Sequence, residues 1–137
     1  MRVVLDTNVV ASALLWGGTP RVLLQAAREK RIELFTSTPM LAELTDILGR
    51  RKFGRKIAAS QLTIDQLVDG YALLASVVRP AATPRIAPDP DDDVVIGTAL
   101  AARADLVVTG DKPLLTVAEH QGVRFVGVSE AVKALTP

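Results

Sequence analysis

Acidic residues that could do chemistry together stand at four places in the sequence, which are Asp6, Glu43, the run Asp91–Asp93, and Asp111. The chain has no cysteine and a single histidine, His120. The lack of cysteine excludes disulfides, thiolate metal sites and cysteine nucleophiles, and one histidine disfavours serine–histidine or histidine-metal chemistry. The acidic residues are therefore the main candidates for reaction chemistry.

Carboxylates held close together repel one another unless they are protonated or neutralised by a cation. Mg²⁺ and Mn²⁺ are hard cations that take oxygen ligands from carboxylates, water and phosphate groups. Such an ion can orient and deprotonate a water molecule and stabilise charge on a phosphate in the transition state. A phosphodiester is therefore a natural substrate for a site with acids and a metal ion but without histidine or cysteine.

The elements that would position these acids alternate between strands and helices. Apolar, β-branched runs predict buried strands at Arg2–Leu5, Glu33–Phe35, Asp105–Val108 and Val123–Val126. Capping residues and apolar periodicity predict several helices. Thr19 and Thr38 are predicted N-caps, each followed by proline at the first helical position, and Thr63 with Gln66 forms a capping box that opens a helix to about Val78. Further helices are predicted over Thr7–Leu15, over VVIGTALAARA from Val94, near Pro113, and from Ser129. This alternation predicts an α/β fold with a parallel sheet and helices on both faces.

The acids fall near the carboxyl ends of the predicted strands, where open α/β sheets bind ligands. Asp6 directly follows the first strand, and Asp111 follows the strand DLVV after Thr109 and Gly110. Glu43 lies early on the helix after the second strand, and Asp91–Asp93 marks the start of the helix before DLVV. We therefore expect all four positions at one edge of the sheet.

Each acid also has a purely structural interpretation. Asp6, Asp111 and one or more of Asp91–Asp93 could cap helices or complement their dipoles. Glu43 could be an exposed surface carboxylate. Together these interpretations require four unrelated explanations that converge on one sheet edge.

The composition indicates one ordinary globular domain over residues 1–137. The chain is 49% hydrophobic and 23% charged with a net charge of +1, so nucleic-acid contacts must rest on local clusters of charge. The proline-rich stretch Pro80–Pro90 is too short to divide domains. The N-terminus MRVVLDTNVV is neither a signal peptide nor a membrane span, which predicts a cytoplasmic protein without membrane contact.

Four motifs together resemble the PIN-domain family, particularly the toxin-like (VapC-like) ribonucleases of toxin–antitoxin pairs. They are LDTNV (Leu5–Val9), TPMLAEL with Glu43, DPDDDVVIGTALAARA from Asp89, and VVTGDKPLL from Val107. The resemblance covers nearly the whole chain in the expected order. It implies a Rossmann-like parallel sheet sandwiched between helices and a Mg²⁺- or Mn²⁺-dependent endoribonuclease that cuts single-stranded RNA. It also implies a homodimer and inhibition by a small antitoxin.

The resemblance assigns the catalytic and metal-binding roles to Asp6, Glu43, Asp93 and Asp111. Asn8 would support the loop or bind a water molecule. Asp93 is chosen because its spacing to Asp111 fits the family best, while Asp91 and Asp92 remain alternative ligands.

A basic cluster interrupted by Phe53 and Gly54 consists of Arg50, Arg51, Lys52, Arg55 and Lys56. It could neutralise RNA phosphates beside the acidic site, with Phe53 available to stack on a base. The alternative is a solvated helix end with Phe53 packed into the core.

Competing functions fit less well. Residues Asp6–Ser12 contain no glycine, which removes the phosphate cradle of a dinucleotide-binding fold. A haloacid-dehalogenase-like phosphatase would have an aspartate where this chain has Asn8, and a receiver domain would have an acidic pair near the first strand. The remaining rival is a PIN-fold scaffold that binds RNA or protein without cleavage, and retention of all four acids disfavours it.

Overall fold

The computed structural model describes residues 1–83 and 90–135, with the side chains of all of these except Pro90 and Asp91. Over these residues the strands form one sheet in the order β3-β2-β1-β4-β6-β5. The strands span Arg2–Leu5 (β1), Glu33–Thr36 (β2), Ser76–Val77 (β3), Leu106–Val108 (β4), Glu119–His120 (β5) and Val123–Val126 (β6). All neighbouring strands are parallel except β5 and β6. The predicted α/β fold is confirmed, with β1 inside the sheet between β2 and β4.

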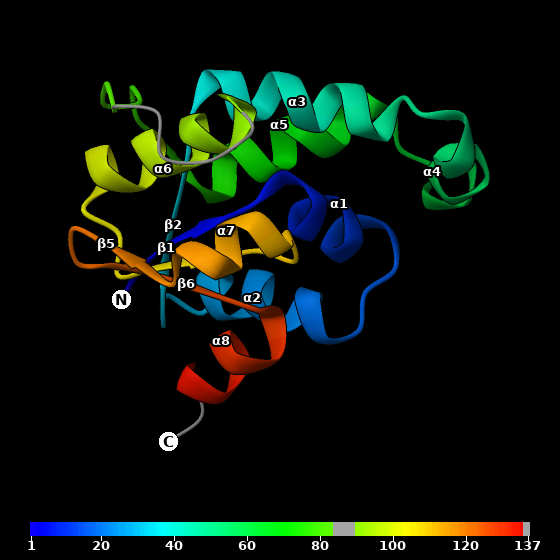
Figure 1. The fold of residues 1–137 in the computed structure, drawn as a ribbon. Helices are drawn as coiled ribbons and strands as arrows, with labels where there is room; N and C mark the ends of the chain where they lie inside the picture. Colours follow the sequence, from blue (N-terminus) through cyan, green and yellow to red (C-terminus); the bar gives the residue numbers. More distant parts are fainter. Residues whose placement is uncertain (84–89, 136–137) are drawn as a thin grey trace.

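The helices connect the strands and cover the sheet on both faces (Figure 1). They span Thr7–Leu15 (α1), Thr19–Arg28 (α2), Thr38–Leu48 (α3), Gly54–Ser60 (α4), Ile64–Leu74 (α5), Pro90–Ala102 (α6), Lys112–Val117 (α7) and Val128–Leu135 (α8), with a 3₁₀ turn at Arg51–Phe53 (η1). None of the helices in the described ranges combines the length and apolarity that crossing a membrane requires.

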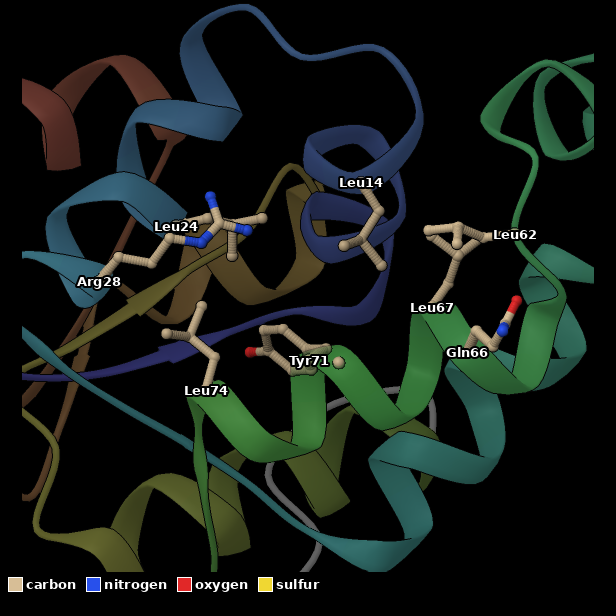
Figure 2. Close-up of a pocket in the computed structure, with 9 residues that line it drawn as sticks. Leu14, Leu24, Arg28, Leu62, Gln66, Leu67, Tyr71 and Leu74 are labelled. Atoms are coloured by element: carbon tan, nitrogen blue, oxygen red, sulfur yellow. The ribbon is translucent and has the colours of Figure 1, made fainter.

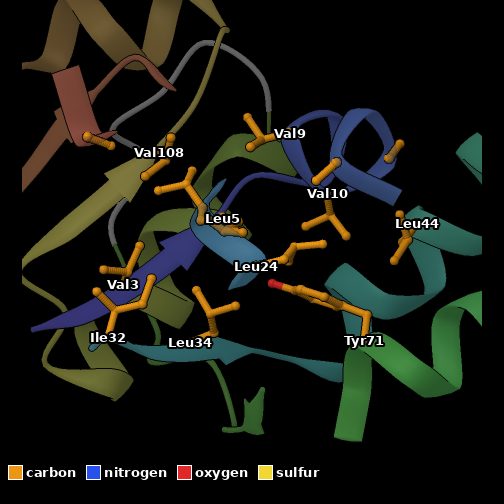
Figure 3. Close-up of a cluster of buried hydrophobic side chains, with 14 of the residues drawn as sticks. Val3, Leu5, Val9, Val10, Leu24, Ile32, Leu34, Leu44, Tyr71 and Val108 are labelled. Atoms are coloured by element: carbon orange, nitrogen blue, oxygen red, sulfur yellow. The ribbon is translucent and has the colours of Figure 1, made fainter. Parts of the chain in front are cut away.

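Two hydrophobic clusters lie on opposite faces of the sheet because successive side chains of a strand point to opposite sides. Val3 and Leu5 join a cluster with residues of α1, α2, α3 and α5, among them Val10, Leu24 and Tyr71 (Figure 3). The residue between them, Val4, packs instead with residues of β6, α6 and α7, namely Phe125, Ile96, Ala99 and Leu114. Burial on both faces is typical of parallel strands, and it holds the end of β1 in a fixed position.

The structure corrects three predicted boundaries. The helix predicted to reach Val78 ends at Leu74, because the backbone at Ala75 is extended and residues Ser76–Val77 pair with β2. The predicted capping box of Thr63 and Gln66 is confirmed. Gly18 and Ser37, rather than Thr19 and Thr38, occupy the N-cap positions of α2 and α3, which shifts each predicted start by one residue.

Helix α6 begins earlier than its apolar pattern predicts. It starts at Pro90 rather than near Val94, so Asp91–Asp93 lies within its first turn. Negative charge in the first turn of a helix is stabilised by the helix dipole. The helix therefore accounts for part of this acidic run, but three consecutive acids exceed what one cap needs.

Candidate active site

Asp6 lies where β1 passes into α1. Its backbone N–H donates to the carbonyl of Val108 (2.9 Å), which continues the β1–β4 ladder by one residue. Its extended backbone makes it the N-cap of α1, and its Oδ1 accepts from the N–H of Thr7 at 2.8 Å. Asp6 is 6% exposed, so the carboxylate is buried at the carboxyl end of an inner strand.

Thr109 joins Asp6 to Asp111. The Thr109 hydroxyl donates to Asp6 Oδ2 at 2.7 Å and accepts from the backbone N–H of Asp111 at 3.0 Å. Asp111 is the N-cap of α7, and its Oδ2 accepts from the N–H of Leu114 at 3.4 Å. The predicted capping roles of both acids are therefore present. One fully buried hydroxyl also fixes the two acids relative to each other.

The electrostatics of this pair favour binding of a cation. Burial raises the pKa of the Asp6 carboxyl, and the negative charge of Asp111 raises it further. The hydrogen bonds from Thr109 and Thr7 act in the opposite direction but come from neutral groups. Because a cation favours ionised carboxylates, a metal ion placed between these acids would offset both unfavourable effects.

Glu43 lies beside α6. It is half-buried and lines a hollow of about 350 Å³ together with Asp46 of the same helix and Val94 of α6. A buried hydrogen bond of 2.8 Å from the hydroxyl of Thr98 to that of Ser37 ties α6 to the start of α3. The structure therefore places Glu43 next to the part of α6 that follows Asp93.

The predicted site residues thus fall into two groups. Asp6 and Asp111 are linked through Thr109, and Glu43 shares its hollow with α6. Within residues 1–83 and 90–135, no three acidic or histidine side chains form a group that could hold a metal ion. Asp92 and Asp93 are half-buried, whereas the side chain of Asp91 lies outside the described atoms. Convergence of all four acids on one cation stays a prediction.

Two polar residues near Asp6 complete the surroundings. Asn8 is exposed and lines a shallow depression with Thr109 and Gly110, so it stands at the rim beside the Asp6–Asp111 link. Thr109 was not singled out as a functional residue by the sequence. The sequence feature that could have identified Thr109 is its position as a polar residue directly after the apolar strand LVV and before Gly110 and Asp111.

The predicted RNA-binding residues are on η1, α4 and the turn before them. All five cations, Arg50, Arg51, Lys52, Arg55 and Lys56, are exposed. Phe53 is half-buried, packs against the core and meets Trp16 edge to face, with the ring centroids 5.3 Å apart. Lys52 and Lys56 lie over the rings of Phe53 and Trp16, at 5.0 and 5.4 Å from their centroids. The packing interpretation therefore accounts for Phe53, and the cations are left open to solvent.

Comparison with known proteins agrees with this architecture. A family model for the PIN domain matches residues 2–113, which include Asp6, Glu43, Asp93 and Asp111. The crystal structure of VapBC2 from Rickettsia felis, bound to a DNA fragment from their promoter, is similar in fold, with a TM-score of 0.63 and 16% sequence identity over 93% of this chain and 98% of that chain. No curated protein matches the sequence.

Proposed function

This chain belongs to the PIN-domain family, and from that premise we propose that it is a metal-dependent endoribonuclease that hydrolyses RNA phosphodiester bonds. The observation that carries the proposal is the link from Asp6 through Thr109 to Asp111. It holds two carboxylates at the carboxyl ends of neighbouring strands, one of them buried and with its pKa raised. Burying one carboxylate beside a second one raises the free energy of the folded state, and a cation bound there would lower it.

The donor set fits Mg²⁺ or Mn²⁺, because every candidate ligand is a carboxylate oxygen. The residues that would hold the ion are Asp6, Glu43, Asp93 and Asp111, with Asp91 and Asp92 as alternatives to Asp93. When bound, the ion supplies a water of lowered pKa and stabilises charge on the scissile phosphate.

The chain's own residues supply the positioning. Thr109 holds one oxygen of Asp6 and the backbone of Asp111, so the two acids keep their relative position when RNA enters. We propose that Glu43 accepts the proton of the attacking water. Its half-buried carboxylate lines the hollow beside α6. Formation of the new bond from the water oxygen to phosphorus breaks the bond to the 3′-oxygen. The 3′-oxygen takes up a proton from solvent, which leaves a 5′-phosphate and a 3′-hydroxyl. Asn8, at the rim, would support the loop or bind a water molecule.

Substrate binding would rest on the exposed cations of η1, α4 and the preceding turn, which would neutralise RNA phosphates. The structural likeness to VapBC2 supports a more specific role as the toxin component of a toxin–antitoxin pair, bound by a small antitoxin. We further propose a cytoplasmic homodimer, as the family resemblance implies.

One observation favours a second candidate function. Because no three acids of the described residues form a metal-binding group, a PIN-fold scaffold that binds RNA or protein without cleavage is the rival. Such a scaffold would retain RNA binding through the basic cluster but would show no metal-dependent turnover.

The test is cleavage of unstructured and structured RNAs in the presence of Mg²⁺, Mn²⁺ or a chelator. We expect the wild type to cut unstructured RNA only with metal, and Asp6→Asn to reduce cleavage at least about a hundredfold, because loss of a direct ligand exceeds the usual effect of losing a residue that supports one. Asp69→Asn, the same change on an exposed face of α5, is the matched control and should cleave normally. Metal-independent cleavage, or none by the wild type at all, would contradict the proposal.

A further inference from the structure

A hollow of about 180 Å³ lies between α1, α2 and α5, away from the acidic edge (Figure 2). Its walls are mostly leucine side chains, those of Leu14, Leu24, Leu62, Leu67 and Leu74. Three polar side chains interrupt this apolar lining, those of Tyr71, Arg28 and Gln66, and no acidic residue lines the hollow. The side-chain oxygen of Gln66 already accepts a hydrogen bond from the backbone N–H of Thr63. We call this hollow the Tyr71 pocket.

The hydroxyl of Tyr71 has no hydrogen-bond partner among the residues that the structure describes. Tyr71 is only 3% exposed, and burial raises the pKa of its phenol. Figure 2 shows the hydroxyl directed toward the end of the pocket where Leu74 and Arg28 lie. Buried polar atoms are nearly always hydrogen-bonded, and leaving one unsatisfied costs about 1–3 kcal/mol. The pocket therefore contains a group that would be stabilised by a hydrogen-bonding ligand.

Arg28 adds a positive charge at the same end of the pocket. It is the last residue of α2, and its guanidinium forms no ion pair or hydrogen bond with any residue in the described part of the chain. In Figure 2, Arg28 lies on the side of the pocket toward which the Tyr71 hydroxyl points. A guanidinium and a phenol hydroxyl are both donors that bind a carboxylate.

The size of the pocket limits what could fill it. An apolar cavity of about 150 Å³ holds a benzene molecule, whereas sites for drug-sized ligands begin at about 300 Å³. A volume of about 180 Å³ therefore suits a ring or a short branched chain. Leucine walls favour an apolar body, and the two donors favour an anionic end.

We propose that the Tyr71 pocket binds a small free monocarboxylate whose apolar body is about the size of a benzene ring. Its carboxylate would accept hydrogen bonds from Tyr71 and Arg28, and its body would replace solvent among the leucines. The proposal does not depend on the nuclease assignment, because none of the predicted catalytic acids lines this pocket. Leu14 and Asp6 stand at opposite ends of α1, about 12 Å apart along the helix axis at 1.5 Å per residue.

The single tyrosine of the chain makes a direct test possible. Protein labelled with 3-fluorotyrosine gives one ¹⁹F resonance, which reports on the surroundings of this hydroxyl. We would titrate it with phenylacetate and with phenylacetamide, a neutral molecule of nearly the same shape. We expect a saturable shift with phenylacetate and binding about tenfold weaker with phenylacetamide, since charge-assisted hydrogen bonds are about twice as strong as neutral ones.

Variants separate the two donors. Arg28→Gln should weaken phenylacetate binding about tenfold and leave phenylacetamide unchanged, whereas Lys30→Gln, the same loss of charge outside the pocket, should change neither. Tyr71→Phe keeps the ring and removes the hydroxyl; by calorimetry it should weaken binding of both probes. No saturable shift, equal affinity for the two probes, or an equal effect of Lys30→Gln and Arg28→Gln would overturn the proposal.

Discussion

The acidic edge, formed by Asp6 and Asp111 at the carboxyl ends of β1 and β4, and the Tyr71 pocket each contain a buried polar group. The two groups differ in the interaction that each lacks. Both oxygens of the Asp6 carboxylate accept hydrogen bonds, yet its charge has another acid, Asp111, as its neighbour. The Tyr71 hydroxyl is neutral and has no hydrogen-bond partner within the described residues. The Asp6 carboxylate would be stabilised by a cation, whereas the Tyr71 hydroxyl would be stabilised by a molecule that can accept or donate a hydrogen bond.

This difference also separates the consequences of the two sites for folding. Repulsion between carboxylates depends on pH and on metal, because either protonation or a cation removes it. The free-energy cost of burying a tyrosine hydroxyl changes neither with pH near neutrality nor with metal, because the phenol stays protonated and carries no charge. The two regions can therefore be distinguished by melting experiments as well as by ligand binding.

The largest effect on stability should come from metal at the acidic edge. A ligand present at 100 times its dissociation constant stabilises the folded state by about 2.7 kcal/mol. We expect Mn²⁺ to raise the melting temperature of the wild type clearly and that of Asp6→Asn barely. In chelator, Asp6→Asn should melt at or above the wild type, since one repelling charge is gone and asparagine is itself a good N-cap. Equal Mn²⁺-induced shifts in thermal melts of both proteins would remove Asp6 from the metal site.

The link through Thr109 gives the next prediction. Thr109→Val keeps the shape of the side chain but removes the hydrogen bond to Asp6 and the acceptor for the Asp111 N–H. Residues that orient metal ligands typically contribute a factor of about 10–100 in metal affinity or activity. We expect a loss of that size in RNA cleavage, measured at saturating Mn²⁺ and again over a range of Mn²⁺ concentrations. Thr116→Val, on the exposed face of α7, is the matched control, and equal activity of the two variants would leave Thr109 with a structural role only.

These experiments concern features that the sequence predicted to different degrees. The strands, their parallel pairing and the positions of Asp6 and Asp111 follow from local patterns, because an acid directly after a buried run must lie at a strand end. Thr109 and the Tyr71 pocket depend on contacts between distant segments. Residues 6 and 109 are 103 positions apart, and three helices enclose the pocket. No local pattern encodes such a juxtaposition.

The strands that the sequence missed have a similar cause. Each of β3 and β5 has two residues, so neither shows an alternating pattern of its own. Ser76–Val77 becomes a strand because it lies along β2, and the N–H of Val78 donates to the carbonyl of Thr36 at 2.8 Å. The helix was predicted to reach Val78 because Val77 and Val78 continue its apolar pattern. Pairing with β2 instead gives these residues an extended backbone.

The raised pKa of Asp6 predicts how the stability of the metal-free protein changes with pH. Because the folded-state pKa lies above the unfolded one, the folded protein binds more protons in the interval between the two values. Stability in chelator should therefore decrease as pH rises through that interval and level off above the folded pKa. Urea unfolding of the wild type and of Asp6→Asn over this pH range checks the sign. The difference in unfolding free energy between the two proteins should grow in favour of Asp6→Asn with rising pH, and a difference that shrinks would contradict the assigned direction.

The smallest expected effect belongs to the Tyr71 pocket without ligand. Tyr71→Phe removes the unpartnered hydroxyl and keeps the ring that packs against the core near Leu24 (Figure 3). Since an unsatisfied buried hydroxyl costs about 1–3 kcal/mol, the variant should be more stable than the wild type by about 1 kcal/mol, measured by urea unfolding in chelator. Unlike the effect of Asp6→Asn, this gain should not change between weakly acidic and neutral pH or on addition of Mn²⁺, because no charge is altered. Saturating phenylacetate should reverse the order, as only the wild type can hydrogen-bond the carboxylate through this position. A less stable Tyr71→Phe variant would mean that the hydroxyl has a partner in solution, and the pocket would then lack the unmet hydrogen bond that distinguishes it from the acidic edge.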